Sequence, residues 1–275
     1  MRTKFLLAIT LFAVAHASTS FGQNAIRSNL DSVIDSLIAQ GKNLTEEGYL
    51  TWNKDQMLRG YAILERAAIM SPQNKLVKYY TAYAGYRLMT YGMAIKQDKI
   101  YGQFADQTEE SAKSLTEKYS DWSEPQSLLA AIYGIEIAHS WLKGPILGPK
   151  SDQLLKKAIS NDSTNPRAYL VFGISKLNTP SFFGGSVDQA IVYLSKSIAL
   201  YEREKSDKDT LNSLSPCWGY EDALAWLGMA YEKKGRYADA LNVYEKALQS
   251  QPNYARVKYS LLPELKKKMA SAVQK

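Results

Sequence analysis

The chain is poor in cysteine, the residue that could cross-link an exported fold covalently. Of its 275 residues only Cys217 is a cysteine, so no internal disulfide can form. Cys217 also lies far from the N-terminus, so no thiol is placed to carry a lipid anchor beside a signal-peptide cleavage site. Stability must therefore come from packing, and we expect Cys217 to be a small buried residue rather than a nucleophile.

Histidine is almost as scarce, and this restricts the chemistry that the chain can perform. Glu136 and His139 have a spacing that could form one edge of a metal site, but zinc needs three or four ligands. The sequence has no Gly-x-Ser-x-Gly motif, no P-loop and no Gly-x-Gly-x-x-Gly motif. We therefore predict a protein that is not an enzyme, with no metal and no cofactor. A carboxylate-based hydrolase is the alternative that needs only two acids.

Hydrophobic runs long enough to span a membrane are absent, and the one apolar run near the N-terminus has the form of a signal peptide. A short segment with two basic residues, Arg2 and Lys4, precedes the apolar run Phe5–Val14, and Ala15-His16-Ala17 is a small-x-small cleavage pattern. A second possible cut follows Gly22. We predict a signal peptide over residues 1–22 and a single mature domain over 23–275, periplasmic or secreted, with no integral membrane segment.

The charge balance is modestly basic. The formal net charge is +7, and removal of Arg2 and Lys4 with the signal peptide would lower it by two. The composition, 45% hydrophobic and 22% charged, is that of a globular protein. A positive charge of this size favours acidic partners, and we expect no nucleic-acid partner in an exported protein.

The stretch Leu224–Pro252 contains two helical faces in one register. The first face consists of Leu224, Leu227, Gly228 and Tyr231, and the second of Ala240, Tyr244, Ala247 and Pro252. Gly235 lies between them and predicts a turn, while Pro252 predicts the end of the second helix. The small residues Gly228 and Ala240 would let two antiparallel helices approach closely. The pattern predicts one helical hairpin.

The same register can be counted towards the N-terminus. Matching positions are Gly60, Leu64, Ala67 and Pro72, then Ala82, then Leu129, Ala130 and Tyr133, then Tyr169, Phe172 and Gly173. We expect the first helix to end near Gly41, a long connection over Thr90–Asp106, and breaks at Gly144-Pro145 and Gly148-Pro149. The fold prediction is all-α: a right-handed α-solenoid of about five helical hairpins, with residues 254–273 as a capping helix.

This register resembles the tetratricopeptide repeat (TPR), whose signature positions are all filled in residues 221–254. Three further features resemble exported bacterial TPR proteins: residues 166–170, the turn over 179–185 and the Trp218-Gly219 corner. That resemblance implies a periplasmic protein of a Gram-negative bacterium. The turn is also similar to one in the periplasmic TPR component of TRAP-type solute transporters. Those proteins are commonly lipid-anchored, whereas this chain lacks the cysteine that would carry the lipid.

In TPR proteins the first helix of each hairpin lines a concave groove, and the resemblance carries this role to defined positions here. The predicted groove residues are Leu76, Tyr79, Tyr83, Tyr86 and Arg87; Arg167, Leu170, Ile174, Leu177 and Asn178; and Asp222, Ala225, Met229, Glu232 and Lys233. Tyr79, Tyr83 and Tyr86 form one stripe along a helix, which could face a ligand or pack against a neighbouring repeat.

The turn over residues 178–185 has five more residues than the corresponding turn of the best-formed repeat. Phe182 and Phe183 could close over the groove, bind a partner directly, or fill the gap between adjacent hairpins. We expect Trp218 and Trp226 to have structural roles.

These observations lead to one functional hypothesis and two alternatives. The chain is predicted to be a periplasmic scaffold that holds an apolar and acidic protein or peptide segment in its groove, within a transporter or envelope complex. The partner-binding residues would be Tyr79, Tyr83, Tyr86, Arg87, Arg167, Leu170, Ile174, Phe182, Phe183, Met229 and Lys233. The alternatives are a small-solute-binding accessory protein of a TRAP-type transporter and the carboxylate-based hydrolase.

Overall fold

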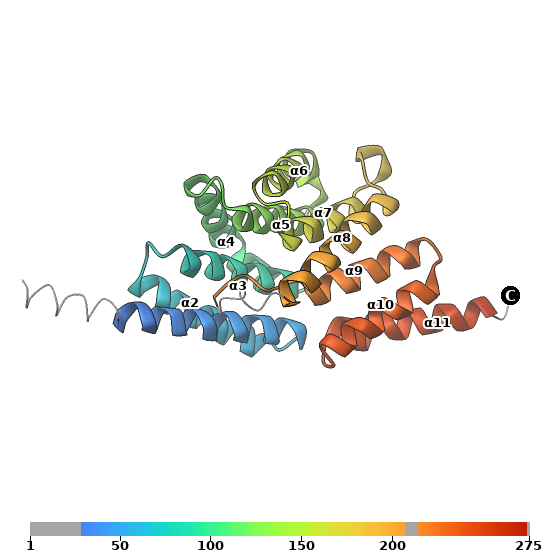
Figure 1. Cartoon of the computed structure of the whole chain (residues 1–275), viewed down its shortest axis with the longest axis horizontal. Coiled ribbons are helices and arrows are strands. Elements are labelled where there is room, and N and C mark those ends of the chain that lie inside the picture. The colour runs from blue at the N-terminus through green and yellow to red at the C-terminus, as the bar shows by residue number, and fades with distance from the viewer. Residues whose placement is uncertain (1–28, 207–213, 274–275) are drawn as a thin grey trace, which may run out of the picture.

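Five helical hairpins stacked side by side, followed by a cap, form the part of the chain that the computed structural model describes, residues 29–206 and 214–273 (Figure 1). The hairpins are helix 29–50 with α2 (Lys54–Met70), α3 (Lys75–Ala94) with α4 (Asp98–Lys118), α5 (Ser123–His139) with α6 (Gly144–Asn161), α7 (Pro166–Asn178) with α8 (Val187–Ser206), and α9 (Tyr220–Lys233) with α10 (Tyr237–Ser250). The cap consists of a π-helical turn, η3 (Val257–Leu261), and α11 (Leu262–Val273). The predicted all-α solenoid with its capping helix is confirmed, and the predicted signal peptide lies outside the described residues.

Asparagine side chains begin several of these helices. Asn74 Oδ1 accepts hydrogen bonds from the backbone N–H groups of Leu76 and Val77, at 2.9 and 3.2 Å. Asn53 caps α2 and Asn165 caps α7 in the same way. Each side chain satisfies N–H groups that have no partner inside the helix, so each boundary is set locally by the sequence.

Glycines in the first hairpin serve close packing rather than helix termination. The first helix continues through Gly41 to residue 50, so the prediction that it ends near Gly41 is wrong. A Cβ atom on Gly41 would lie 2.9 Å from Leu64 Cδ2, and one on Gly60 would lie 2.8 Å from the Gly41 carbonyl oxygen. The backbones of the first helix and α2 therefore lie in close contact at Gly41 and Gly60. Gly41 permits this contact, and was wrongly interpreted from the sequence as the end of the helix.

The predicted long connection over Thr90–Asp106 and the predicted break at Gly148-Pro149 are also wrong, whereas Gly144-Pro145 marks the start of α6 directly after the turn of the third hairpin. The connection between α3 and α4 is only residues 95–97, because both helices extend well into the expected loop. In the third hairpin a short 3-10 turn, η1 (Trp141–Lys143), precedes α6, and Pro145 lies in the first turn of α6. Proline is tolerated in the first turn of a helix, where its missing N–H group would have no partner. Pro149 lies farther inside α6 and does not end it, because the helix continues to Asn161.

Within residues 29–206 and 214–273, no helix is long and apolar enough to cross a membrane.

The best-formed repeat supplies a direct test of the close helix approach. A Cβ atom on Gly228 would overlap the ring of Tyr244, so we expect Gly228→Ala to lower the free energy of unfolding by about 1 to 3 kcal/mol. Gly134, in α5, is the matched control because a Cβ atom there would meet nothing within 4 Å. Gly134→Ala should raise stability by about 0.5 to 1 kcal/mol. Urea unfolding of both variants measures this, and equal effects of the two would contradict the packing.

Candidate functional site

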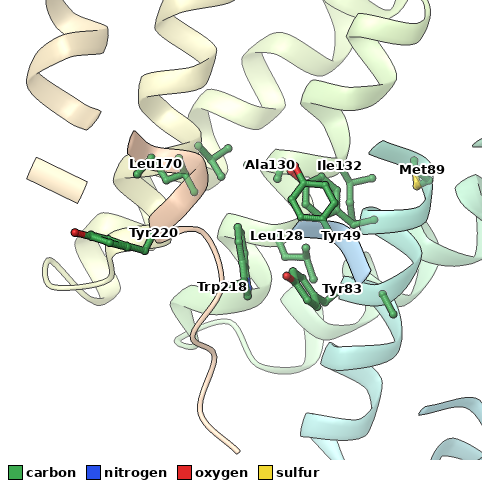
Figure 2. Packing of buried hydrophobic residues seen from close by; sticks show 14 of the residues in the cluster. Tyr49, Tyr83, Met89, Leu128, Ala130, Ile132, Leu170, Trp218 and Tyr220 are labelled. Carbon is green, nitrogen blue, oxygen red and sulfur yellow. The ribbon is translucent and has the colours of Figure 1, made fainter. Parts of the chain in front are cut away.

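The inner face of the solenoid, where the predicted groove residues lie, is covered in its N-terminal half by the chain itself. Residues 214–219, which precede α9, lie beside the inner helices, and Trp218 is buried between them (Figure 2). The Trp218 ring is stacked on that of Tyr83, with centroids 5.3 Å apart. Its Nε1 donates a hydrogen bond of 2.8 Å to the Tyr79 hydroxyl. The tyrosine stripe therefore packs against Trp218.

Backbone geometry makes this insertion possible. Gly219 follows Trp218 with a φ of +106°, which non-glycine residues rarely adopt. A Cβ atom on Gly219 would also overlap the hydroxyl of Tyr201, which donates a 2.8 Å hydrogen bond to the Trp218 carbonyl. Tyr80 donates to the carbonyl of Leu214 at 2.8 Å, so residues 214–219 are fixed at both ends.

Beside Trp218 lies a buried charged cluster, which we call the Arg167 cluster. Arg167 Nε donates to both carboxylate oxygens of Glu124, at 2.8 and 2.9 Å, and its Nη2 donates to Glu204 at 2.8 Å. Glu124 also accepts from the Tyr79 hydroxyl at 3.1 Å. Burial raises the pKa of Glu124 above its ordinary value, although Arg167 opposes that shift. This cluster joins α3, α5, α7 and α8.

A second cluster, the Arg87 cluster, joins the two ends of the solenoid. Arg87 Nη1, on α3, donates to Asp222 Oδ2, on α9, at 2.8 Å. Asp222 Oδ1 accepts from the hydroxyls of Tyr49 and Tyr254, at 3.1 and 2.8 Å. Arg87 Nη2 lies 3.3 Å from the Glu46 carboxylate. Residues from the first, second and fifth hairpins, and Tyr254 just before the cap, therefore meet at one buried ion pair.

The carboxylates of the Arg87 cluster have opposite pKa shifts. Burial raises the pKa of Glu46 to about 7, because the positive charge of Arg87 only partly compensates and Asp222 adds repulsion. Burial alone would also raise the pKa of Asp222, but Arg87 and Arg256 hold it below its ordinary value. Asp222 is thus the charged partner of Arg87, and Glu46 titrates near neutral pH.

The predicted groove residues divide into two groups in the structure. Six of the eleven predicted partner-binding residues are buried by contacts within the chain: Tyr79, Tyr83, Tyr86, Arg87, Arg167 and Leu170. The further groove positions Leu177, Asp222 and Ala225 are buried as well. The other inner-face members, Ile174 on α7 with Met229 and Lys233 on α9, reach solvent. We call these three residues, with Trp226 and Arg256 beside them, the open inner surface. The role of either group in partner binding stays a prediction.

The lengthened turn lies outside the groove. Phe182 and Phe183, in the 3-10 turn η2 (Ser181–Phe183), are almost fully exposed and contact each other edge to face, with centroids 5.2 Å apart. They do not fill the gap between hairpins, so that alternative is wrong. The turn is held by hydrogen bonds from Gly185 N to Pro180 O and from Lys176 Nζ to Gly184 O, at 3.1 and 3.2 Å. Cys217 is exposed, which corrects the expectation of a buried thiol.

Several residues that organise the inner face were missed at the level of sequence. Glu46 and Tyr49 lie beyond Gly41, where the first helix was expected to have ended. Glu124 could have been found from the sequence, because the register of the third hairpin places it at the same repeat position as Arg167 and Asp222. Opposite charges at equivalent positions of neighbouring inner helices indicate an ion pair across the hairpins rather than groove residues that face a ligand.

The side chains of Glu136 and His139 each contact other residues of the fold. The His139 ring is stacked on Tyr101, with centroids 3.9 Å apart, and its Nε2 lies 3.4 Å from Asp98 Oδ1. Glu136 accepts a hydrogen bond from Lys143 at 2.7 Å. Among the residues that the structure describes, no group of three or more histidine, cysteine, aspartate and glutamate side chains could hold a metal ion.

The pKa of Glu46 gives a testable dependence of stability on pH. Because the folded-state pKa of about 7 exceeds the ordinary 4.5, Glu46 contributes stability that is full below the ordinary value and is lost as the pH rises through about 7. Relative to a Glu46→Gln variant, the wild type should lose on the order of 2 kcal/mol of unfolding free energy between about pH 5 and about pH 8. Urea titrations at both pH values measure this, and parallel pH profiles would contradict it.

Comparison with known proteins agrees with this architecture. The family model described as tetratricopeptide repeat matches residues 221–254, and a search of curated proteins found no significant match. The HusA haemophore from Porphyromonas gingivalis has a similar structure, with 22% identity and a TM-score of 0.56 over 74% of this chain and 93% of that one. TTC0263 from Thermus thermophilus, described as a thermophilic TPR protein, has 18% identity and a TM-score of 0.54 over 86% and 100%. One repeat, residues 221–254, thus matches the tetratricopeptide family, and the five stacked hairpins have the fold of a tetratricopeptide solenoid.

Proposed function

We propose that the chain is a non-enzymatic, exported scaffold that binds a partner protein segment on its open inner surface. The observation that carries this proposal is the division of the inner face. The N-terminal half is closed by Trp218 and the two charged clusters, whereas Ile174 and Met229 on the remaining inner helices reach solvent. A TPR fold supports a protein-binding role, and this is the part of its usual groove that a partner could contact.

The chemistry of the open inner surface defines the kind of segment that it fits. Ile174, Met229 and Trp226 supply apolar area, and methionine adapts to different partner shapes. Arg256 lies over the Trp226 ring at 4.3 Å and within 3.2 Å of Met229 Sδ, and Lys233 Nζ reaches the carbonyl of Leu177. Apolar side chains beside two cations suit a segment that carries both apolar and acidic residues.

The proposed export of the protein is supported by its N-terminal sequence. Residues 1–22 have the basic, apolar and small-residue regions of a signal peptide. The periplasm of a Gram-negative bacterium is the compartment in which we place the protein, on the resemblance of its turn and Trp218-Gly219 corner to exported TPR proteins.

Carriage of a small molecule is the second candidate, favoured by the structural likeness to a protein described as a haemophore. The cavity beside the Arg167 cluster has a volume of about 270 Å³, and its lining carries the paired charges of Glu124, Arg167 and Glu204. Haemin titration of the purified protein tests this candidate, and a stoichiometric Soret shift would favour carriage over the scaffold.

Site-specific photo-cross-linking in cells tests the scaffold proposal. A cross-linker at Ile174 should capture one defined protein, whereas one at exposed Ile69, on α2, should not. Adding Met229→Glu should reduce the capture at Ile174 at least about tenfold, because it places a negative charge against an acidic segment. Val192→Glu, an exposed change on α8, is the matched control and should leave capture unchanged. Equal capture in both variants would overturn the assignment.

A further inference from the structure

The turns within the hairpins lie along one edge of the solenoid. Each hairpin reverses direction at the same end, and side-chain contacts join neighbouring turns. Asp98, after the second turn, lies 3.4 Å from His139, before the third. Lys234, in the fifth turn, pairs with Asp188, after the fourth, at 2.8 Å. Helix α5 packs on α7, so the third and fourth hairpins are neighbours in the stack. We call this edge the turn edge.

Large apolar side chains protrude from the third and fourth turns of the turn edge. They are Phe182 (91% exposed), Trp141 (78%), Phe183 (73%), Leu142 (67%) and Ile146 (64%). Figure 1 shows the fourth turn projecting beyond the helices that flank it. Isolated exposed apolar residues are ordinary, but a group of this kind on two adjacent turns marks an interaction surface.

Basic side chains surround these apolar tips. They are Lys96 and Lys99 around the second turn, Lys143 and Lys150 around the third, and Lys234 and Arg236 in the fifth, and all are exposed. The acids at the same turns that reach solvent are Asp98, Asp188 and Asp239. Lys143, Lys234 and Arg236 form ion pairs with Glu136, Asp188 and Asp239, whereas Lys96, Lys99 and Lys150 form no ion pair within the described residues. Lys150 follows Ile146 by four residues on α6, so a cation and an apolar side chain share one face of that helix.

We propose that the turn edge binds the surface of an anionic phospholipid bilayer. Tryptophan and phenylalanine at convex tips can insert between headgroups without a complementary pocket, and flanking lysines attract anionic lipid. A protein partner would need matching shape around five projecting side chains, whereas a bilayer deforms to admit them. The chain would then lie on a membrane and leave its open inner surface, on separate residues, for a protein segment.

The opposite edge provides an internal control. Ile69 lies near the end of α2 and Tyr259 lies in η3, after α10, so both are at the far ends of their hairpins from the turn edge. Their exposures, 81% and 72%, match those of the aromatic tips. Substitution there removes comparable apolar surface without changing the turn edge.

Co-sedimentation of the full mature chain with vesicles tests this inference. The protein should bind vesicles of equal parts phosphatidylglycerol and phosphatidylcholine, and should bind pure phosphatidylcholine much more weakly. The combined change Trp141→Ala, Phe182→Ala and Phe183→Ala should reduce partitioning at least about tenfold. Lys99→Gln and Lys150→Gln should each reduce it about fivefold. Ile69→Ala with Tyr259→Ala should leave it unchanged.

Quenching of tryptophan emission by brominated lipid supplies a second measurement. Wild-type protein should be quenched, and Trp141→Phe should lose most of that quenching while it still binds, because Trp141 is the tryptophan among the apolar tips of the third and fourth turns, whereas Trp52, in the first turn, is only 37% exposed. Wild-type affinity in the triple variant, equal binding to both vesicle types, or no binding at low salt would overturn the inference. A protein captured by a cross-linker at Leu142 and lost in the triple variant, without vesicle binding by the wild type, would instead make the edge a protein-binding surface.

Discussion

The buried ion pair between Arg87 and Asp222 determines the shape of this solenoid. It joins α3 to α9 across 135 positions of sequence, at 2.8 Å, and each side chain is almost completely removed from solvent. A charge in that environment requires its partner, since loss of either one would leave the other buried and unpaired at about 3 to 5 kcal/mol. An open TPR array contacts only neighbouring repeats, whereas here the first and fifth hairpins are held together. Tyr49 and Tyr254, which donate to the same carboxylate, extend this closure to the first helix and the cap.

Closure changes where the protein can act. Once α3 and α9 are joined, Trp218 lies against Tyr79 and Tyr83, and the Arg167 cluster completes a buried polar layer beside it. The inner positions that usually bind ligands then support the fold in the N-terminal half. Accessible chemistry remains at the open inner surface and at the turn edge. The two surfaces are built from different residues, so a partner segment and a membrane could be bound at once.

The sequence predicted the periodic features of the fold and missed those that depend on distant contacts. Hairpin count, the close approach at Gly228 and the cap follow from spacing along the chain, which local packing enforces. Gly41 was misinterpreted because a glycine gives the same local signal at a helix end and at a helix crossing. The closed groove was missed for another reason. The register shows that Tyr83 and Arg87 face inward, but it does not show that residues 214–219 return to cover them.

A double-mutant cycle on Arg87 and Asp222 tests this closure most directly. Unfolding free energies would be measured for Arg87→Met, Asp222→Asn, the combined variant and the wild type. If α3 and α9 are joined as described, the two changes should be strongly non-additive, with a coupling energy of at least about 2 kcal/mol. A coupling energy within about 0.5 kcal/mol of zero, as expected of distant and independent sites, would contradict the account.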